Sequence, residues 1–267
     1  VAAGSIAQTL ELARAAHGRH AWREAFDLLV AADRERGLGA PDLVRLGDAA
    51  YWAGHLDASL GAMERAYAAF RALGDDCSAA LVALSLRLDY TTKPALATAT
   101  GWLRRAERVL EGQPECLAHG YLAGVYAVQA IARGDLDSAL AETERMIELG
   151  SRLPDRDLHV LGLQRQGQVL VARGAVAQGL ELLDEVVVAA MSGELGINAT
   201  AVIYCSAIAT CRDLGDYGRA REWSEAAKRW CEREASTGFP GLCRIYHGEI
   251  VRRRGSWQQA EQAVRLA

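Results

Sequence analysis

A glycine or proline recurs along this chain at a nearly constant interval, and this period restricts the fold more than any other feature. The six positions are Gly54, Pro94, Gly134, Gly174, Gly215 and Gly255, separated by 40, 40, 40, 41 and 40 residues. Around three of them, Gly134, Gly215 and Gly255, the order is glycine, a polar residue, a large residue, two further residues and alanine. A fixed period of this length indicates an array of supersecondary units.

Each of these positions marks a tight turn between two helical segments. Apolar residues recur at helical spacing over Asn198 to Leu214, before Gly215, and over Tyr217 to Glu232, after it. Neither segment can bury its apolar face alone, so the pairs must stack on one another. We therefore predict an all-α helical-hairpin solenoid, a single array over residues 1–267. Its seven units are predicted at residues 5–36, 41–73, 76–111, 115–150, 155–190, 198–234 and 241–267.

The second helix of several units carries a small residue near its start. These residues are Ala139, Gly179, Ala220 and Ala260. A larger side chain would hold the two helices of a pair apart, so we expect the backbones to approach closely at these positions.

The turn region and its flanking residues resemble the tetratricopeptide repeat. The residues that carry the resemblance are Leu46-Gly47 followed by Gly54, and Gly215-Asp216-Tyr217 with Ala220 and Ala227. The period of that repeat is 34 residues, shorter than the period of this chain. The resemblance implies a right-handed superhelix with about seven helix pairs.

The longer period is similar to that of the repeat regions of large LuxR-type ATPase regulators from actinobacteria. Cys211-Arg212-Asp213-Leu214-Gly215-Asp216 and Phe239-Pro240-Gly241-Leu242-Cys243-Arg244 add to this likeness. Those regulators resemble the maltose-operon activator, in which a nucleotide-binding module precedes the repeats and a helix-turn-helix module follows them. Similar repeats also stand behind adenylate-cyclase and kinase-like modules, so the likeness is specific to the repeats and leaves the parent protein open.

Composition limits the partners and the compartment. The net charge of −4 and the pI of about 5.9 leave no basic face for nucleic acid. No apolar run reaches the ~18 residues that span a bilayer, and Val1 to Leu10 lacks the pattern of a secretory signal, so we expect a cytoplasmic protein without membrane contact. The six cysteines form no Cys-x-x-Cys pair, which disfavours a zinc site. We expect them to be small packing residues, with a redox-sensitive thiol between Cys205 and Cys243 as the alternative.

Motifs that carry catalysis are missing from the sequence. The two lysines, Lys93 and Lys228, stand in no phosphate-binding loop. No His-Glu-x-x-His and no Gly-x-Ser-x-Gly occurs. The paired acids Asp75 and Asp76 fall at a helix start, where carboxylates cap backbone N–H groups. We therefore predict a protein that is not an enzyme and that uses no cofactor and no metal.

The first helices of the units of a superhelical array line its concave face, where such proteins hold ligands. Counting back from each turn by the tetratricopeptide offsets places ten residues on this face. They are Asp48, Tyr51, Trp52, Tyr121, Gln164, Gln168, Cys205, Arg212, Glu249 and Arg252. Aromatic, amide and charged groups in this mixture suit a polar organic ligand or a peptide, and packing or solvation is the alternative for each residue.

Two functions follow from this reasoning. In the first, the chain is the sensor and protein-interaction region of a larger LuxR-type transcription regulator, and a ligand or partner changes the curvature of the array. The resemblance to the maltose activator implies a sugar as one effector, stacked on Tyr51, Trp52 and Tyr121. In the second, the chain is a free-standing scaffold that holds peptide segments. Either form can self-associate through the apolar faces of its terminal units.

Overall fold

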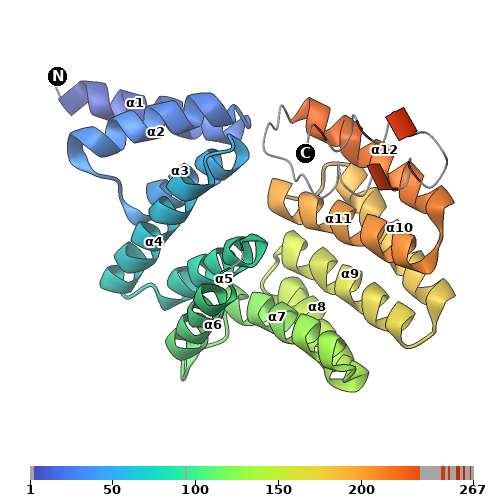
Figure 1. Ribbon diagram of the computed structural model, residues 1–267. Coiled ribbons are helices and arrows are strands. Elements are labelled where there is room, and N and C mark those ends of the chain that lie inside the picture. Colours follow the sequence, from blue (N-terminus) through green and yellow to red (C-terminus); the bar gives the residue numbers. More distant parts are fainter. Residues whose placement is uncertain are drawn as a thin grey trace. The chain divides into compact units, whose positions relative to one another are not determined.

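The computed structural model describes residues 3–93, 95–234, 248, 249, 252, 257, 258, 261 and 265. Across that part of the chain the secondary structure consists of α-helices joined by short loops (Figure 1). The helices are α1 (Ala3–Gly18), α2 (Trp22–Arg36), α3 (Ala40–Trp52), α4 (Leu56–Leu73), α5 (Asp76–Thr92), α6 (Leu96–Leu110), α7 (Leu117–Arg133), α8 (Leu136–Arg152), α9 (Arg156–Ala172), α10 (Val176–Met191), α11 (Ile197–Leu214) and α12 (Tyr217–Arg233). This confirms the predicted all-α helical-repeat solenoid.

The predicted turn glycines lie where one helix of a pair ends and the next begins. Gly54, Gly134, Gly174 and Gly215 have φ angles of 86°, 75°, 86° and 77°. This left-handed region suits glycine because a Cβ atom would clash there. Pro94 and Gly255 lie outside the described residues, as does most of the predicted seventh unit.

Small residues bring the helices of a pair together as expected. Ala139 and Ala220 are fully buried. A Cβ atom on Gly179 of α10 would stand 2.6 Å from the carbonyl oxygen of Gly167 on α9, so these two backbones are in direct contact. Ala260 lies outside the described residues.

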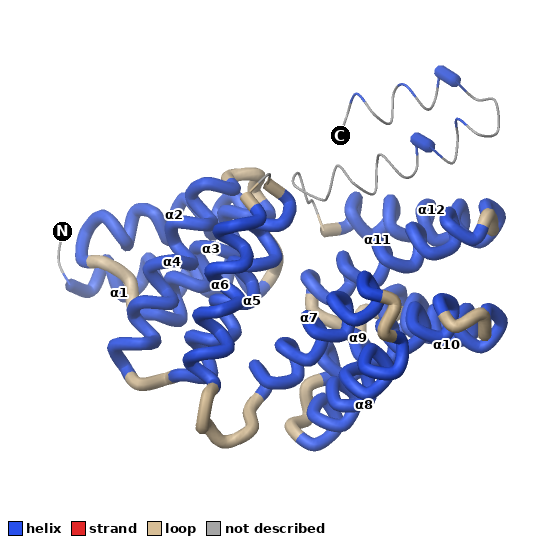
Figure 2. The backbone as a smooth tube through the Cα atoms, turned by 60° about the horizontal axis from the view of Figure 1, so that its bottom comes forward, coloured by secondary structure: helices blue, strands red, loops and turns tan. Residues whose placement is uncertain are grey.

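The described helices form two compact units that divide inside the first turn of α7, between Ala118 and His119. Unit 1 contains α1 to α6, and unit 2 contains the rest of α7 together with α8 to α12. In unit 1, α4 packs against both α3 and α5, and in unit 2, α9 packs against both α8 and α10. Figure 2 shows the short loops inside each pair of helices. The organisation of all repeats into one array stays a prediction.

An ion pair repeats between equivalent positions of the two units. Lys93, just after α5, pairs with Asp57 in the first turn of α4 at 2.6 Å. Arg173, just after α9, pairs with Asp137 in the first turn of α8. Corresponding partners are 80 residues apart, which is two repeat periods, so the sequence period is also a period of side-chain contacts.

Two of the cysteines differ from the expectation that all six are packing residues. Cys77 and Cys116 are joined in a disulfide, with their Cα atoms 6.3 Å apart. Our expectation of packing residues was therefore wrong for this pair. It holds for Cys211, a fully buried free thiol, whereas Cys205 and Cys231 are only partly buried. Cys243 lies outside the described residues.

Candidate functional site

The first helices of unit 1 are joined by charged side chains. Arg14 of α1 donates through Nε and Nη2 to the carboxylate of Asp42 on α3, at 3.0 and 2.6 Å. Arg45 donates to the same carboxylate at 2.9 Å. The hydrogen bond from Arg14 is the main reason that the pKa of Asp42 lies below its usual value, although the carboxyl is buried. The buried carboxylate is thus compensated by two arginines.

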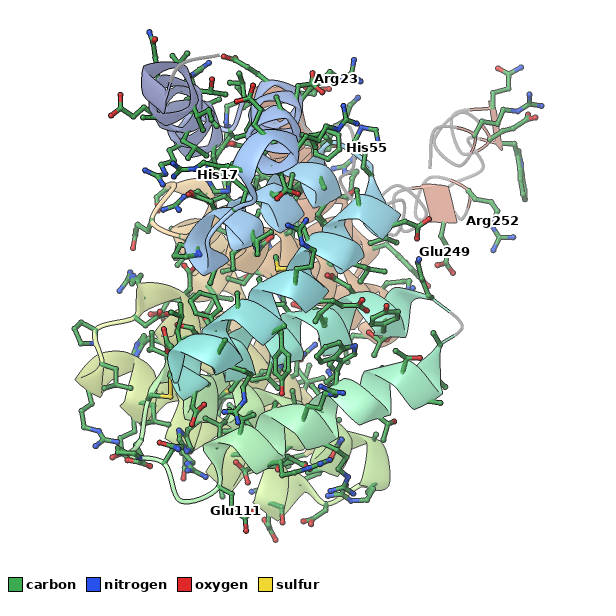
Figure 3. All side chains as sticks on the ribbon, turned by 90° about the vertical axis from the view of Figure 1, so that its left-hand side faces the viewer. His17, Arg23, His55, Glu111, Glu249 and Arg252 are labelled. Atoms are coloured by element: carbon green, nitrogen blue, oxygen red, sulfur yellow. A yellow bond between two sulfur atoms is a disulfide. The ribbon has the colours of Figure 1, made fainter. Side chains whose placement is uncertain are left out.

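A second polar contact lies one helical turn further along the same helices. His17 of α1 (labelled in Figure 3) places Nε2 3.6 Å from the carboxylate of Asp48 on α3. Burial, followed by the nearby charge of Asp48, raises the pKa of Asp89 on α5 to about 7. Asp48, predicted for the ligand-binding face, is therefore in electrostatic contact with side chains of both neighbouring first helices.

The two predicted aromatic residues of α3 have different environments. Trp52 is 1% exposed and stacks on Trp22 of α2, with ring centroids 6.1 Å apart. Tyr51 is half-buried and meets Trp52 edge-on at 5.5 Å. The prediction that Trp52 is available to a ligand is wrong, because its ring is enclosed by the core. Tyr51 keeps an exposed edge.

In unit 2, Tyr121 links α7 to the start of α9. Its hydroxyl lies 3.5 Å from Asp155, whose carboxylate accepts the backbone N–H of Leu158 at 2.7 Å and so caps α9. Burial is the main cause that raises the pKa of Tyr121, with the charge of Asp155 next. Tyr121 therefore remains a neutral phenol that donates a hydrogen bond.

The two glutamines of α9 also differ. Gln168 donates through Nε2 to Thr210 of α11 at 3.4 Å and accepts from Arg165 at 2.9 Å, so it lies at a polar junction between two first helices. Gln164 is fully buried, and neither atom of its amide has a hydrogen-bond partner. The prediction that Gln164 faces a ligand is wrong. It is a core residue.

Four predicted residues remain, namely Cys205 and Arg212 on α11 and Glu249 and Arg252 beyond α12. Arg212 donates to its neighbour Asp213 at 2.9 and 2.7 Å and lies 3.6 Å from the carboxylate of Glu249. Cys205 is partly buried, and Arg252 is exposed. Glu249 and Arg252 are both labelled in Figure 3. The structure therefore brings Arg212 and Glu249 together.

Sequence reasoning missed several residues of these polar contacts. Arg14, Asp42 and Arg45 in unit 1 and Arg165 and Thr210 in unit 2 belong with the predicted residues. Asp42, Arg45 and Asp48 follow one another at steps of three residues on one helix, and this spacing between neighbours was the signal that could have found the first two.

The described residues include no group of three His, Cys, Asp or Glu side chains that could hold a metal ion. Of the described helices, none combines the length and apolar character needed to cross a membrane.

Neither a family model nor a curated protein matches this chain. Solved structures do. The chain is similar to a signal transduction ATPase with numerous domains from Pyrococcus horikoshii that carries a tetratricopeptide repeat sensor, with a TM-score of 0.51 and 14% identity. The match covers 92% of this chain but only 37% of the ATPase, so the chain spans little more than a third of that protein.

Two further structures are similar over a larger share of their length. One is the apo form of the quorum sensor NprR from B. thuringiensis, with a TM-score of 0.55, 13% identity, and coverage of 92% of this chain and 70% of the sensor. The other is a tetratricopeptide repeat protein from Parabacteroides merdae, with a TM-score of 0.51, 15% identity, and coverage of 99% and 94%. At these identities the likeness establishes the fold, which is that of tetratricopeptide-like repeats.

Proposed function

We propose that this chain is a non-catalytic sensor and interaction region of a larger signalling protein, and that it binds a polar effector or a peptide on its first helices. The observation that carries this proposal is the polar contact between the successive first helices α9 and α11, where Gln168 donates to Thr210 at 3.4 Å. The partly exposed pair of Arg212 with Glu249 adds a charged contact next to α11. Partly exposed polar groups at such positions supply directional recognition.

The similar structures support the same reading. One is a repeat sensor attached to a signal transduction ATPase, and another is a quorum sensor. Sensing is thus one use of this fold in those proteins. The finer proposal is a cytoplasmic LuxR-type transcription regulator, and it rests on the resemblance of the repeats. In that protein a sugar is the first effector to test.

The test uses the isolated chain and two sets of probes. Mono- and disaccharides form the first set, and random short peptides form the second. A ligand present at about 100 times its dissociation constant should stabilise the fold by ~2.7 kcal/mol and raise the melting temperature. Stabilisation by a small molecule supports the sensor. Stabilisation by peptides alone supports the alternative, a free-standing scaffold.

The location of the site is tested with a matched pair of arginine variants. Arg212→Ala removes a cation from α11, and Arg221→Ala removes an exposed one from α12, the second helix of the same pair. We expect Arg212→Ala to weaken binding about tenfold, equal to ~1.4 kcal/mol, and Arg221→Ala to leave it unchanged. Equal affinity of the two variants would place the ligand elsewhere.

A further inference from the structure

The disulfide between Cys77 and Cys116 joins two first helices at their N-terminal ends. Cys77 is the second residue of α5, and Cys116 directly precedes α7. The two residues are 39 positions apart, close to one repeat period, so they occupy nearly equivalent places in the third and fourth repeats. Both residues are only partly buried.

Helix N-termini change the redox chemistry of the cysteines located there. The positive end of the helix dipole stabilises a thiolate, which lowers the thiol pKa and makes the sulfur a better leaving group. Both sulfurs of this disulfide have such a position, so the reduced form is stabilised at both ends. A disulfide with a stabilised reduced form is reduced more readily than an ordinary structural one.

The neighbouring acids are engaged in other contacts. Asp75 accepts the backbone N–H of Ser78 at 3.0 Å and so caps α5. Asp76 pairs with Arg71 and accepts from the side-chain amide of Gln113 at 2.9 Å. Their negative charges are therefore partly compensated beside the disulfide.

The disulfide also has a particular place in the fold. It fixes the residue before α7 to α5, and the two compact units divide two residues later, after Ala118. The loop that leads to it, Glu111 to Glu115, is exposed along its length (Figure 2 shows it between α6 and α7). The exposed side-chain hydrogen bond from Gln113 to Asp76 is a second contact between this loop and α5.

We propose that Cys77 and Cys116 form a reversible thiol–disulfide exchange site, reduced by a cellular thiol or dithiol, whose state sets the order of the start of α7. A thiolate of the reductant attacks one sulfur, the Cys77–Cys116 bond breaks, and a mixed disulfide forms. A second thiolate releases it, so two electrons and two protons pass to the cysteines and the reductant leaves as its own disulfide. The proposal does not depend on any ligand.

The first measurement is the redox equilibrium of the full chain. The native protein is equilibrated in mixtures of reduced and oxidised glutathione, quenched with acid, alkylated and mapped by mass spectrometry. We expect Cys77 and Cys116 to exchange together and to be mostly reduced in about 10 mM reduced glutathione without denaturant. A bond that stays intact under these conditions, or two free thiols after air oxidation, would overturn the proposal.

The second measurement is hydrogen exchange at the start of α7. We expect the first hydrogen-bonded amides of α7, from Tyr121 onward, to exchange about tenfold faster in the reduced protein than in the oxidised one. Cys77→Ser and Cys116→Ser should show the fast pattern without reductant, and Cys231→Ser, which removes a partly buried cysteine outside this disulfide, should behave as wild type. If a serine variant does not fold, reduced wild type still gives the comparison. Identical exchange in both states refutes control of α7.

Discussion

Gln164 shows how a single buried amide can oppose stability. It is fully buried on α9, and neither its oxygen nor its nitrogen has a partner. Burial of an amide without hydrogen bonds costs about 1–3 kcal/mol in proteins. We expect Gln164→Leu to raise the free energy of unfolding by about 1–2 kcal/mol, because the apolar side chain removes this cost. Urea denaturation followed by circular dichroism measures the change.

The matched control for this prediction is Gln168→Leu on the same helix. Gln168 is hydrogen-bonded to both Thr210 and Arg165, so its replacement by leucine removes these two hydrogen bonds. We expect no stabilisation from that variant. Equal effects of the two substitutions would contradict the difference in environment that the structure assigns to them.

Asp89 makes the stability of the protein depend on pH. Burial, followed by the charge of Asp48, raises its pKa from 3.8 to about 7 in the folded state. From about pH 4 to pH 7 the folded protein therefore binds more protons than the unfolded chain at this group. Its contribution to stability is full below pH 4 and is lost as the pH rises through 7.

We expect Asp89→Asn to abolish this dependence. The variant should gain stability relative to wild type as the pH rises from about 4 to 7, with a constant difference above that range. Urea midpoints over this range measure the difference. Asp48→Asn should lower the pKa of Asp89 only in part, because burial is the larger cause. A constant difference from pH 4 to pH 8 would refute the raised pKa.

Two glycines inside helices differ in how closely other atoms approach them. A Cβ atom on Gly179 of α10 would lie 2.6 Å from the carbonyl oxygen of Gly167 and 2.7 Å from Val171 Cγ2. Gly61 of α4 is exposed, and nothing lies within 4 Å of its added Cβ atom. The two positions therefore respond to alanine in opposite directions.

We expect Gly179→Ala to destabilise the protein by about 1–3 kcal/mol, because α9 and α10 must move apart. Gly61→Ala should stabilise it by about 0.5–1 kcal/mol through helix propensity. Urea denaturation of both variants tests the helix packing. A neutral Gly179→Ala would show that α9 and α10 do not meet as described.

The helices themselves could be read from the sequence because the cause of each boundary is local. A glycine with positive φ ends the first helix at Gly54 and Gly215, and apolar residues at helical spacing define the flanking segments. The candidate site was harder to predict because residues at the same offset from the turn differ in exposure. Counting ten residues back from the turn reaches fully buried Gln164 before Gly174, but partly buried Cys205 before Gly215.

Two other errors have non-local causes. Trp52 is enclosed by Trp22, which comes from the preceding helix pair and has no fixed sequence relation to it. The disulfide depends on the approach of α5 and α7, although the separation of Cys77 and Cys116 by nearly one period was a usable signal. Repeat periodicity therefore predicts equivalent positions, and only packing tells which of them are exposed.

At the scale of the whole molecule, the division into two units predicts how far a local change spreads. Gly179 lies in unit 2, and its contacts are with α9. In repeat proteins stability is nearly a sum of the repeats and of the interfaces between neighbours, so destabilisation stays near its origin.

We therefore expect Gly179→Ala to speed hydrogen exchange in α9 and α10 and to leave α2 to α4 of unit 1 unchanged. Mass spectrometry of peptides from the two units measures the exchange rates of both sets of helices in one experiment. Gly61→Ala supplies the reverse comparison, because its stabilising effect should slow exchange in unit 1 alone. Faster exchange in α2 to α4 of the Gly179→Ala protein would mean that the two units unfold as one. In that case a ligand bound to either unit would stabilise both units, and binding at the first helices of one unit would be coupled to binding at those of the other.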